Sequence, residues 1–226
     1  MAKLNPLILL PLLSFLWLAS GVVLAGRYYP GYDHLGQFMS ELGASGTTHG
    51  AWVNLLVFAG AEVWVLLFVA LAGRNFIGNG VALAGLLLLA VYAFLLLIAA
   101  FFPCDFECRP VEPTRSHLIH VSAGMSAYAA GLCGLFLIST GLRRDGRGAV
   151  SDRTAGLLVL AGAGLLAGTV LSQGYAGLFQ RVLEGLLYLW MIRIGVALSR
   201  QAAQVDVTPD KRSADPGPTR RSTRQI

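Results

Sequence analysis

The chain has 226 residues, of which 55% are hydrophobic and only 13% are charged. Soluble domains carry about 25% charged residues, and a single core of this size cannot bury so large an apolar surface. The composition excludes a soluble globular domain. The net charge of +5 is not accompanied by a basic fold with interleaved aromatic residues, which excludes a nucleic-acid-binding module.

Six apolar runs are each close to the length of about 20 residues that crosses a bilayer as a helix. They are Leu7–Ala25, Ala51–Ala72, Gly80–Phe102, Leu118–Thr140, Ala155–Ser172 and Leu178–Leu198. The first run follows Lys3, as in a signal peptide, but it is longer than a signal h-region and five more runs follow it. We therefore predict an all-α bundle of six transmembrane helices over residues 1–198. Residues 199–226 are rich in Pro, Ser and Arg and are predicted to form a disordered, basic cytoplasmic tail.

The basic residues are distributed unevenly between the two ends of these runs. Of the 17 Lys and Arg residues, only Arg27, Arg109, Arg115 and Arg181 fall at the end opposite to both termini, and Arg193 lies within the last run. The positive-inside rule then predicts that both termini are cytoplasmic, in the inner (cytoplasmic) cell membrane. The basic end would contact anionic headgroups, so we expect membrane lipids as partners and no nucleic acid.

The connection after the first run contains aromatic residues that suit the headgroup level, namely Tyr28, Tyr29 and Tyr32. Apolar residues recur at helical spacing between Asp33 and Leu42, and Asp33 is a suitable N-cap. We predict a short interfacial helix here. It either closes over the bundle or only anchors the chain in the headgroups.

Glu62 lies near the middle of the second run, where an ionised carboxylate is costly. Two interpretations remain open for this residue. It is either a neutral glutamic acid that is hydrogen-bonded to a serine or tyrosine, or part of a proton path.

Cys104 and Cys108 lie in the second outer connection, where disulfides persist. A tight turn between them brings their Cα atoms within bridging distance, so we predict a disulfide. It is either a structural staple or a redox pair that passes electrons to a quinone, although redox pairs usually have Cys-x-x-Cys spacing. Cys133, inside the fourth run, is interpreted as a small apolar residue.

His117 and His120 begin the fourth run and are three residues apart, so both project from one face of a helix. They are either an interfacial pair that bonds to carbonyls, a general base, or a pair of metal ligands. One helix face cannot supply both axial ligands of a haem, and we expect no cofactor. In the fifth run, Gly164 and Gly168 have the spacing of a helix-packing motif, which suits bundle packing or a homodimer.

The last run begins with three polar residues, Gln180, Arg181 and Glu184. Arg181 and Glu184 are three residues apart, so they are expected to pair on one face of the helix. The alternative is that Arg181 clamps a phosphate or carboxylate group of a ligand.

Several short motifs occur in order at the ends of these runs: Pro30–Asp33, Ser40–Gly43, Phe102–Asp105, Leu118–His120 and Gly177–Arg181. In this the chain resembles the bacterial and archaeal membrane proteins catalogued as domain of unknown function 998, over roughly residues 5 to 198. The resemblance implies a six-span bundle and no known reaction.

Polar side chains gather at the predicted outer end, where they would form one outward-facing pocket. The candidate catalytic residues are Asp33, Ser40, Glu41, His117 and His120. The candidate ligand-binding residues are Tyr32, Gln180, Arg181 and Glu184. One hypothesis is a hydrolase-like enzyme acting on a lipid or other amphiphile, although the sequence shows no complete spacing of metal ligands or of a catalytic triad. The alternatives are a noncatalytic membrane partner or sensor, a small transporter that uses Glu62 and Glu184, and a thiol–quinone redox protein.

Overall fold

The structure is a computed structural model that describes residues 5–148 and 150–207, and every regular element in these residues is a helix. The long single helices are α1 (Pro6–Tyr28), α4 (Gly80–Phe101), α5 (Arg115–Arg144), α6 (Asp152–Leu171) and α7 (Ala176–Val207). The remaining span consists of α2 (Gly50–Trp52), the π-helix η2 (Val53–Phe58), α3 (Ala59–Ala72) and the 3-10 helix η3 (Gly73–Phe76). Six helices are thus long and apolar enough to cross a membrane, which confirms the predicted multi-pass architecture.

Polar side chains mark the starts of four of these helices. Asn5 and Asn79 each accept a hydrogen bond of 2.9 Å from an amide in the first turn of α1 and of α4, respectively. Thr114 and Ser151 cap α5 and α6 in the same way. Such caps satisfy amide groups that have no partner within the helix, so the local sequence sets these boundaries.

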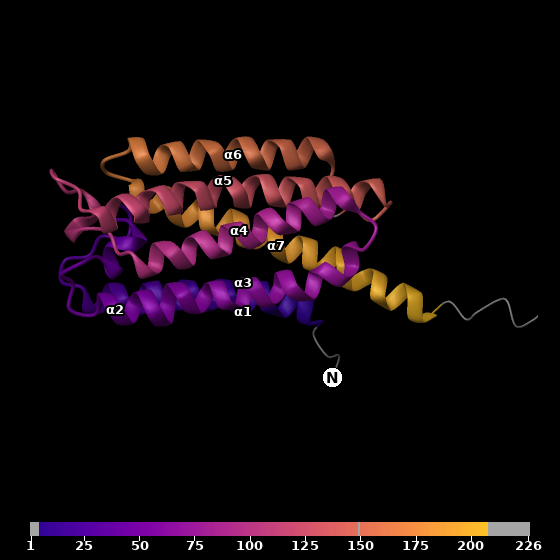
Figure 1. The fold of residues 1–226 in the computed structure, drawn as a ribbon, viewed down its shortest axis with the longest axis horizontal. Coiled ribbons are helices and arrows are strands. Elements are labelled where there is room, and N and C mark those ends of the chain that lie inside the picture. Colours follow the sequence, from indigo (N-terminus) through magenta and orange to yellow (C-terminus); the bar gives the residue numbers. More distant parts are fainter. Residues whose placement is uncertain (1–4, 149, 208–226) are drawn as a thin grey trace, which may run out of the picture.

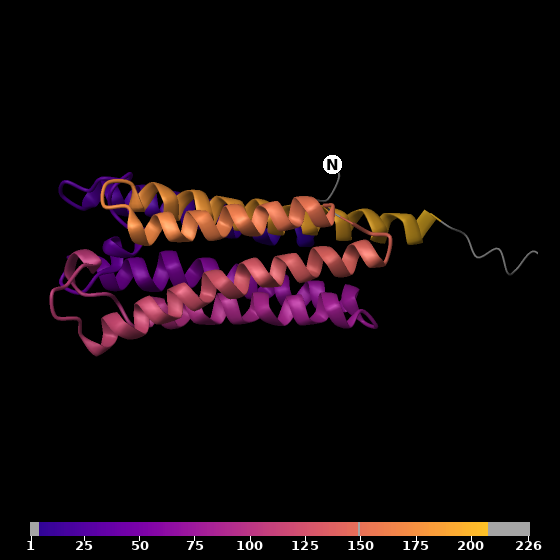
Figure 2. The same cartoon turned by 90° about the horizontal axis from the view of Figure 1, so that it is seen from above.

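The long helices lie side by side along the long axis of the molecule (Figures 1 and 2). α4 packs along α5, α1 contacts both α3 and α7, and α6 packs against α5 and α7. We call the end with the connections 29–49, 102–114 and 172–175 the site end. The opposite end is called the basic end, because Arg74, Arg143, Arg144, Arg147 and Arg153 lie there.

The packed core lies in the middle of the bundle. Phe68 of α3, Tyr92 of α4, Leu135 of α5 and Tyr188 of α7 are fully buried there. On the outside, large apolar side chains such as those of Leu87 and Leu160 are exposed. This arrangement is what a bundle surrounded by lipid requires, since apolar side chains on its surface meet hydrocarbon.

α4 and α5 approach each other closely because glycines face one another across their contact. A Cβ atom at Gly134 would lie 2.8 Å from the carbonyl oxygen of Gly85, and one at Gly85 would lie 2.6 Å from that of Gly134. In α6, by contrast, a Cβ at Gly164 would meet nothing within 4 Å, whereas one at Gly168 would meet the ring of Phe179. The backbones of α4 and α5 are thus in close contact, whereas Gly164 faces open space.

Two boundaries differ from the sequence prediction. The short interfacial helix is the 3-10 helix η1 (Met39–Gly43), and residues 34–37 form a turn and a bend instead. The Asp33 carboxylate accepts hydrogen bonds from the amides of Leu35 and Gly36, which favours a turn over a continuing helix. α7 continues past Leu198 to Val207, and residues 208–226 of the predicted tail lie outside the described part.

Candidate functional site

Two adjoining cavities lie in the half of the bundle nearest the site end. The deep cavity, of about 80 Å³, lies between the helices and is lined by Glu62, Glu184 and apolar residues such as Leu96. The wide cavity, of about 470 Å³, is lined by α5, α6 and the connections at the site end. The two cavities share five lining residues, which are Ser40, His120, Gly124, Tyr128 and Gln180.

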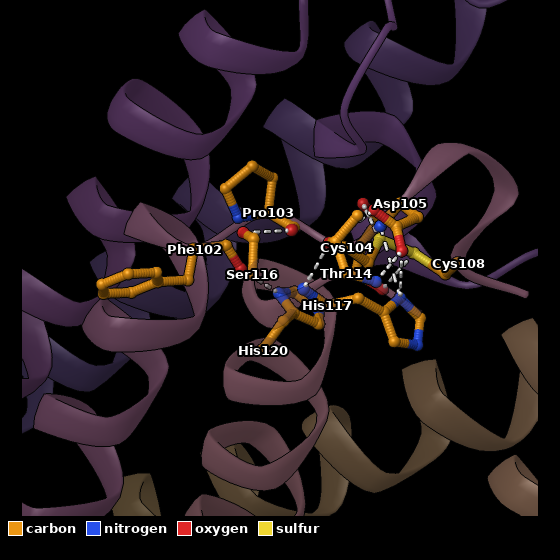
Figure 3. Close-up of polar contacts among 10 residues, drawn as sticks. Phe102, Pro103, Cys104, Asp105, Cys108, Thr114, Ser116, His117 and His120 are labelled. Atoms are coloured by element: carbon orange, nitrogen blue, oxygen red, sulfur yellow. Dashed lines mark hydrogen bonds and ion pairs between the residues drawn. A yellow bond between two sulfur atoms is a disulfide. The ribbon is translucent and has the colours of Figure 1, made fainter. Parts of the chain in front are cut away.

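His120 lies in the second turn of α5 and faces both cavities. Its Nδ1 is 2.8 Å from the carbonyl oxygen of Ala99 and 3.1 Å from that of Phe102 (Figure 3). Because both partners are acceptors, Nδ1 must carry the proton in the neutral ring. Nε2 is then the proton acceptor of this imidazole, which is the form that a general base needs.

His117, one turn earlier, lines only the wide cavity and serves the loop beside it. Its Nδ1 accepts a hydrogen bond of 3.3 Å from the amide of Asp105 and is 4.0 Å from that residue's carboxylate (Figure 3). The Asp105 carboxylate also accepts hydrogen bonds from the amide and the hydroxyl of Thr114, and these bonds hold the pKa of Asp105 below its ordinary value. The two histidines thus have different hydrogen-bond partners.

The predicted disulfide is present, with the Cα atoms of Cys104 and Cys108 5.1 Å apart. Glu107 and Cys108 both have positive φ angles, which the tight turn between the cysteines requires. Ser40 is 3.4 Å from the Cys108 sulfur, and Cys108 lines the wide cavity. The disulfide therefore fixes one wall of the cavity against η1. Cys133 is free and exposed on the outside of α5, where lipid would cover it.

Gln180 connects α7 with η1 at the point where the cavities meet. Its side-chain oxygen accepts a hydrogen bond of 2.8 Å from the amide of Met39. Its side-chain nitrogen lies 3.4 Å from the hydroxyl of Tyr128, a long contact that leaves donor capacity for a ligand.

Asp33 and Glu41 form hydrogen bonds within the connection 29–49, and neither residue lines the deep or the wide cavity. Asp33 closes the turn at residues 33–36. Buried Glu41 accepts hydrogen bonds from the amide of Phe38 and the side chain of Gln37. Burial raises the pKa of Glu41, and these hydrogen bonds oppose that shift. The structure thus makes these two candidate catalytic residues supports of the loop.

Arg181 does not line either cavity and contacts the connection 29–49 instead. Its guanidinium donates to the carbonyl oxygens of Gln37 and Gly177 and to the hydroxyl of Tyr32, at 3.1, 2.9 and 2.7 Å. Burial raises the pKa of Tyr32 to about 12, although Arg181 beside it lowers that value. Arg181 and Tyr32 therefore fasten the connection to α7, and the expected single pocket is divided into two groups.

The expected pairing of Arg181 with Glu184 does not form, because Glu184 has other partners. Its carboxylate accepts hydrogen bonds from Tyr128 of α5 at 2.7 Å and Tyr92 of α4 at 3.1 Å. Although Arg181 and Glu184 are one helical turn apart on α7, the Arg181 side chain points toward the connection 29–49 and the Glu184 side chain points into the bundle. Neither tyrosine was predicted as a site residue from the sequence. Their polar tips in the middle of a span were the available signal.

Glu62 of α3 is 4% exposed and lines the deep cavity with Glu184. Its Oε2 has no hydrogen-bond partner in the described structure, contrary to the interpretation that a serine or tyrosine bonds to it. Ser14 of α1 bonds instead to the carbonyl of Ala61 and to Tyr188. Glu62 is therefore the polar group of this site that most needs a partner.

Within residues 5–148 and 150–207, no three His, Cys, Asp or Glu side chains come together as a metal site would need. No curated protein and no solved structure matches the chain. Residues 12–197 match the family described as "Protein of unknown function (DUF998)", as the motifs indicated, and the chain therefore belongs to that family.

Proposed function

We propose that this protein binds a single-chain amphiphile in the wide and deep cavities and hydrolyses it, with His120 as the general base. The observation that carries the proposal is that His120, with Nδ1 fixed by two carbonyl oxygens, lines both cavities where they meet. A ligand that occupies both cavities must pass this imidazole.

The lining of the wide cavity suits the apolar part of such a ligand. Val121 and Met125 of α5 and Leu166 and Val170 of α6 line it, and Val121 and Val170 are also exposed on the lipid-facing surface. A chain can therefore enter from the bilayer between α5 and α6. Small-molecule sites are typically apolar with a few polar groups that fix orientation, and here Ser40 and Gln180, which line the cavity, would do this.

The chemistry follows from the tautomer of His120. Its Nε2 takes a proton from water, and the hydroxide adds to the carbonyl carbon of an ester or amide. The bond to the leaving group then breaks, and the proton returns from Nε2 to that group. Gln180 can donate its side-chain N–H to the developing oxyanion.

The test uses a residue that can fill the cavities without disturbing the core. A Cβ atom at Gly124 meets nothing within 4 Å, and Gly124 lines both cavities. Gly124→Leu should therefore block the site, and Gly164→Leu, also in open space but on α6, is the matched control. Purified protein in nanodiscs is incubated with single-chain esters and amides, bound amphiphile is measured by native mass spectrometry, and released fatty acid is measured separately.

We expect wild type and Gly164→Leu to bind and hydrolyse at least one of these compounds, and Gly124→Leu to do neither. His120→Gln should keep binding but lose hydrolysis by about 100-fold or more. Equal binding by the two glycine variants would refute the cavity as the site. Unchanged hydrolysis in His120→Gln would refute the base.

A second function is favoured by the buried carboxylates that line the deep cavity. A carrier that couples substrate movement to protons would use Glu62 and Glu184 in this position. It would show proton flux into liposomes that depends on Glu62 and persists in His120→Gln.

We also propose the orientation of the molecule. Arg74, Arg143, Arg144, Arg147 and Arg153 gather at the basic end, so this end and both termini would face the cytoplasm. The amphiphile would then enter from the outer leaflet.

A further inference from the structure

Two carboxylates share the deep cavity, and both are almost completely buried. Glu62 of α3 is 4% exposed and Glu184 of α7 is 6% exposed. Neither role proposed above for His120 or Gln180 uses them. A buried carboxylate is costly unless a proton, a hydrogen-bond donor or a cation compensates its charge.

The two carboxylates are compensated unequally. Tyr128 and Tyr92 each donate a hydrogen bond to Glu184, one to each of its oxygens. Glu62 Oε2 has no partner in the described structure, although it is buried. One donor is therefore missing at Glu62, and the cavity that this residue lines is the place from which a donor can come.

The surroundings favour a positively charged donor. The described residues that line the deep cavity include no lysine or arginine. Arg181 is engaged by Tyr32 and by backbone carbonyls, and Arg109 stands over the ring of Phe38 at 5.0 Å. Fixed positive charge is thus kept away from the deep cavity, whereas two acidic groups face it.

The dimensions limit the cation to a small head. The deep cavity of about 80 Å³ has room for a few water-sized groups, and apolar side chains such as Leu18, Phe58 and Leu96 surround the carboxylates. An alkylammonium head fits both features, because it has three N–H donors and an apolar stem. The five residues shared with the wide cavity let that stem continue past His120.

We infer that the amphiphile bears a protonated primary amine, which Glu62 and Glu184 bind in the deep cavity while its chain lies in the wide cavity. The inference rests on the proposed function and names its ligand class. The Glu62 carboxylate accepts one ammonium N–H, and Glu184 accepts a second while keeping its bonds to the tyrosines. The amphiphile is thus selected by its charge.

The experiment compares octylamine, octanol and octanoate as ligands of the full chain in phosphatidylcholine nanodiscs at neutral pH. Binding to the folded state raises the unfolding midpoint in a concentration-dependent way, which yields an apparent Kd for each compound. The variants are Glu62→Gln, the cavity-blocking Gly124→Leu, and Glu112→Gln as a matched control, because Glu112 is exposed in the connection at 102–114.

We expect wild type and Glu112→Gln to bind octylamine about tenfold or more tightly than octanol, as a charge-assisted hydrogen bond would provide, and to bind octanoate least. Glu62→Gln should lose this preference and keep the affinity for octanol. Gly124→Leu should lose both. If Glu62→Gln fails to fold, the order of the three ligands on wild type, and its loss in Gly124→Leu, decides the matter.

The failures are distinguishable. Equal affinities for octylamine and octanol, both lost in Gly124→Leu, would overturn the amine but leave the amphiphile site standing. A preference for octylamine that persists in Glu62→Gln would overturn the assignment to Glu62. If none of the three compounds binds wild type, both the inference and the proposed amphiphile site fall, and the carboxylates hold protons only.

Discussion

The contact between α4 and α5 permits a quantitative test of the fold at Gly134. A Cβ atom there would lie 2.8 Å from the oxygen of Gly85 and 3.0 Å from the nitrogen of Leu89, and both are backbone atoms. Ordinary contacts of a Cβ begin near 3.4 Å, so Gly134→Ala must push the helices apart by roughly half an ångström. A gap of this size forfeits about a quarter to a half of the dispersion energy at the affected contacts.

We expect Gly134→Ala to lower the free energy of unfolding by about 1–3 kcal/mol, as overpacking does. The matched control is Gly164→Ala, where the added methyl meets open space and the higher helix propensity of alanine should stabilise by up to about 1 kcal/mol. Both are measured by unfolding in mixed micelles with increasing dodecyl sulfate, followed by circular dichroism. Equal stabilities of the two variants would refute the close approach of α4 and α5. Destabilisation of Gly164→Ala that depends on protein concentration would instead indicate the homodimer proposed for this helix.

Three further predictions concern the site end. Replacing both Cys104 and Cys108 by Ser should lower the thermal midpoint and leave hydrolysis intact, and loss of hydrolysis in a folded double variant would favour the redox interpretation. In wild type, a maleimide should label one cysteine before reduction and three after it. Because the pKa of Asp105 is lowered in the folded state, its contribution to stability is present above its ordinary value of 3.8 and disappears as the pH falls through the folded value. Midpoints of wild type and Asp105→Asn should therefore converge in acid, and a constant difference would contradict this. Topology reporters fused after Gly146 and after Glu107 should report opposite compartments, with Gly146 cytoplasmic; the reverse assignment would overturn the proposed orientation.

Much of the fold could be predicted because lipid simplifies the problem. Apolar runs of sufficient length have one stable arrangement in a bilayer, and six of them became six spans. Features that depend on residues close together in the sequence could also be predicted, as the disulfide between Cys104 and Cys108 shows. The close contact of α4 and α5 was not predicted, because Gly85 and Gly134 lie in different apolar runs and neither run indicates which other helix it packs against.

The site was predicted less well, because residues at one end of a bundle can still point in different directions. Proximity in depth suggested that Asp33, Glu41 and Arg181 would join His120, but the first two hold turns and the third holds Tyr32. The helical spacing of Arg181 and Glu184 allowed a pair, and the competing partners came from distant positions. Tyr92 and Tyr128 are 36 residues apart in the chain and meet at one carboxylate only after packing.

The Glu184 carboxylate constrains which substitutions this protein can accept during evolution. Glu184 joins α4, α5 and α7 through two phenols, so a mutation to an apolar residue there would leave two buried hydroxyl groups without acceptors at once. Loss of either tyrosine alone would in turn leave a glutamate with half of its donors. These three positions should therefore covary, and relatives in which Glu184 is replaced by leucine should carry phenylalanine at the positions of Tyr92 and Tyr128.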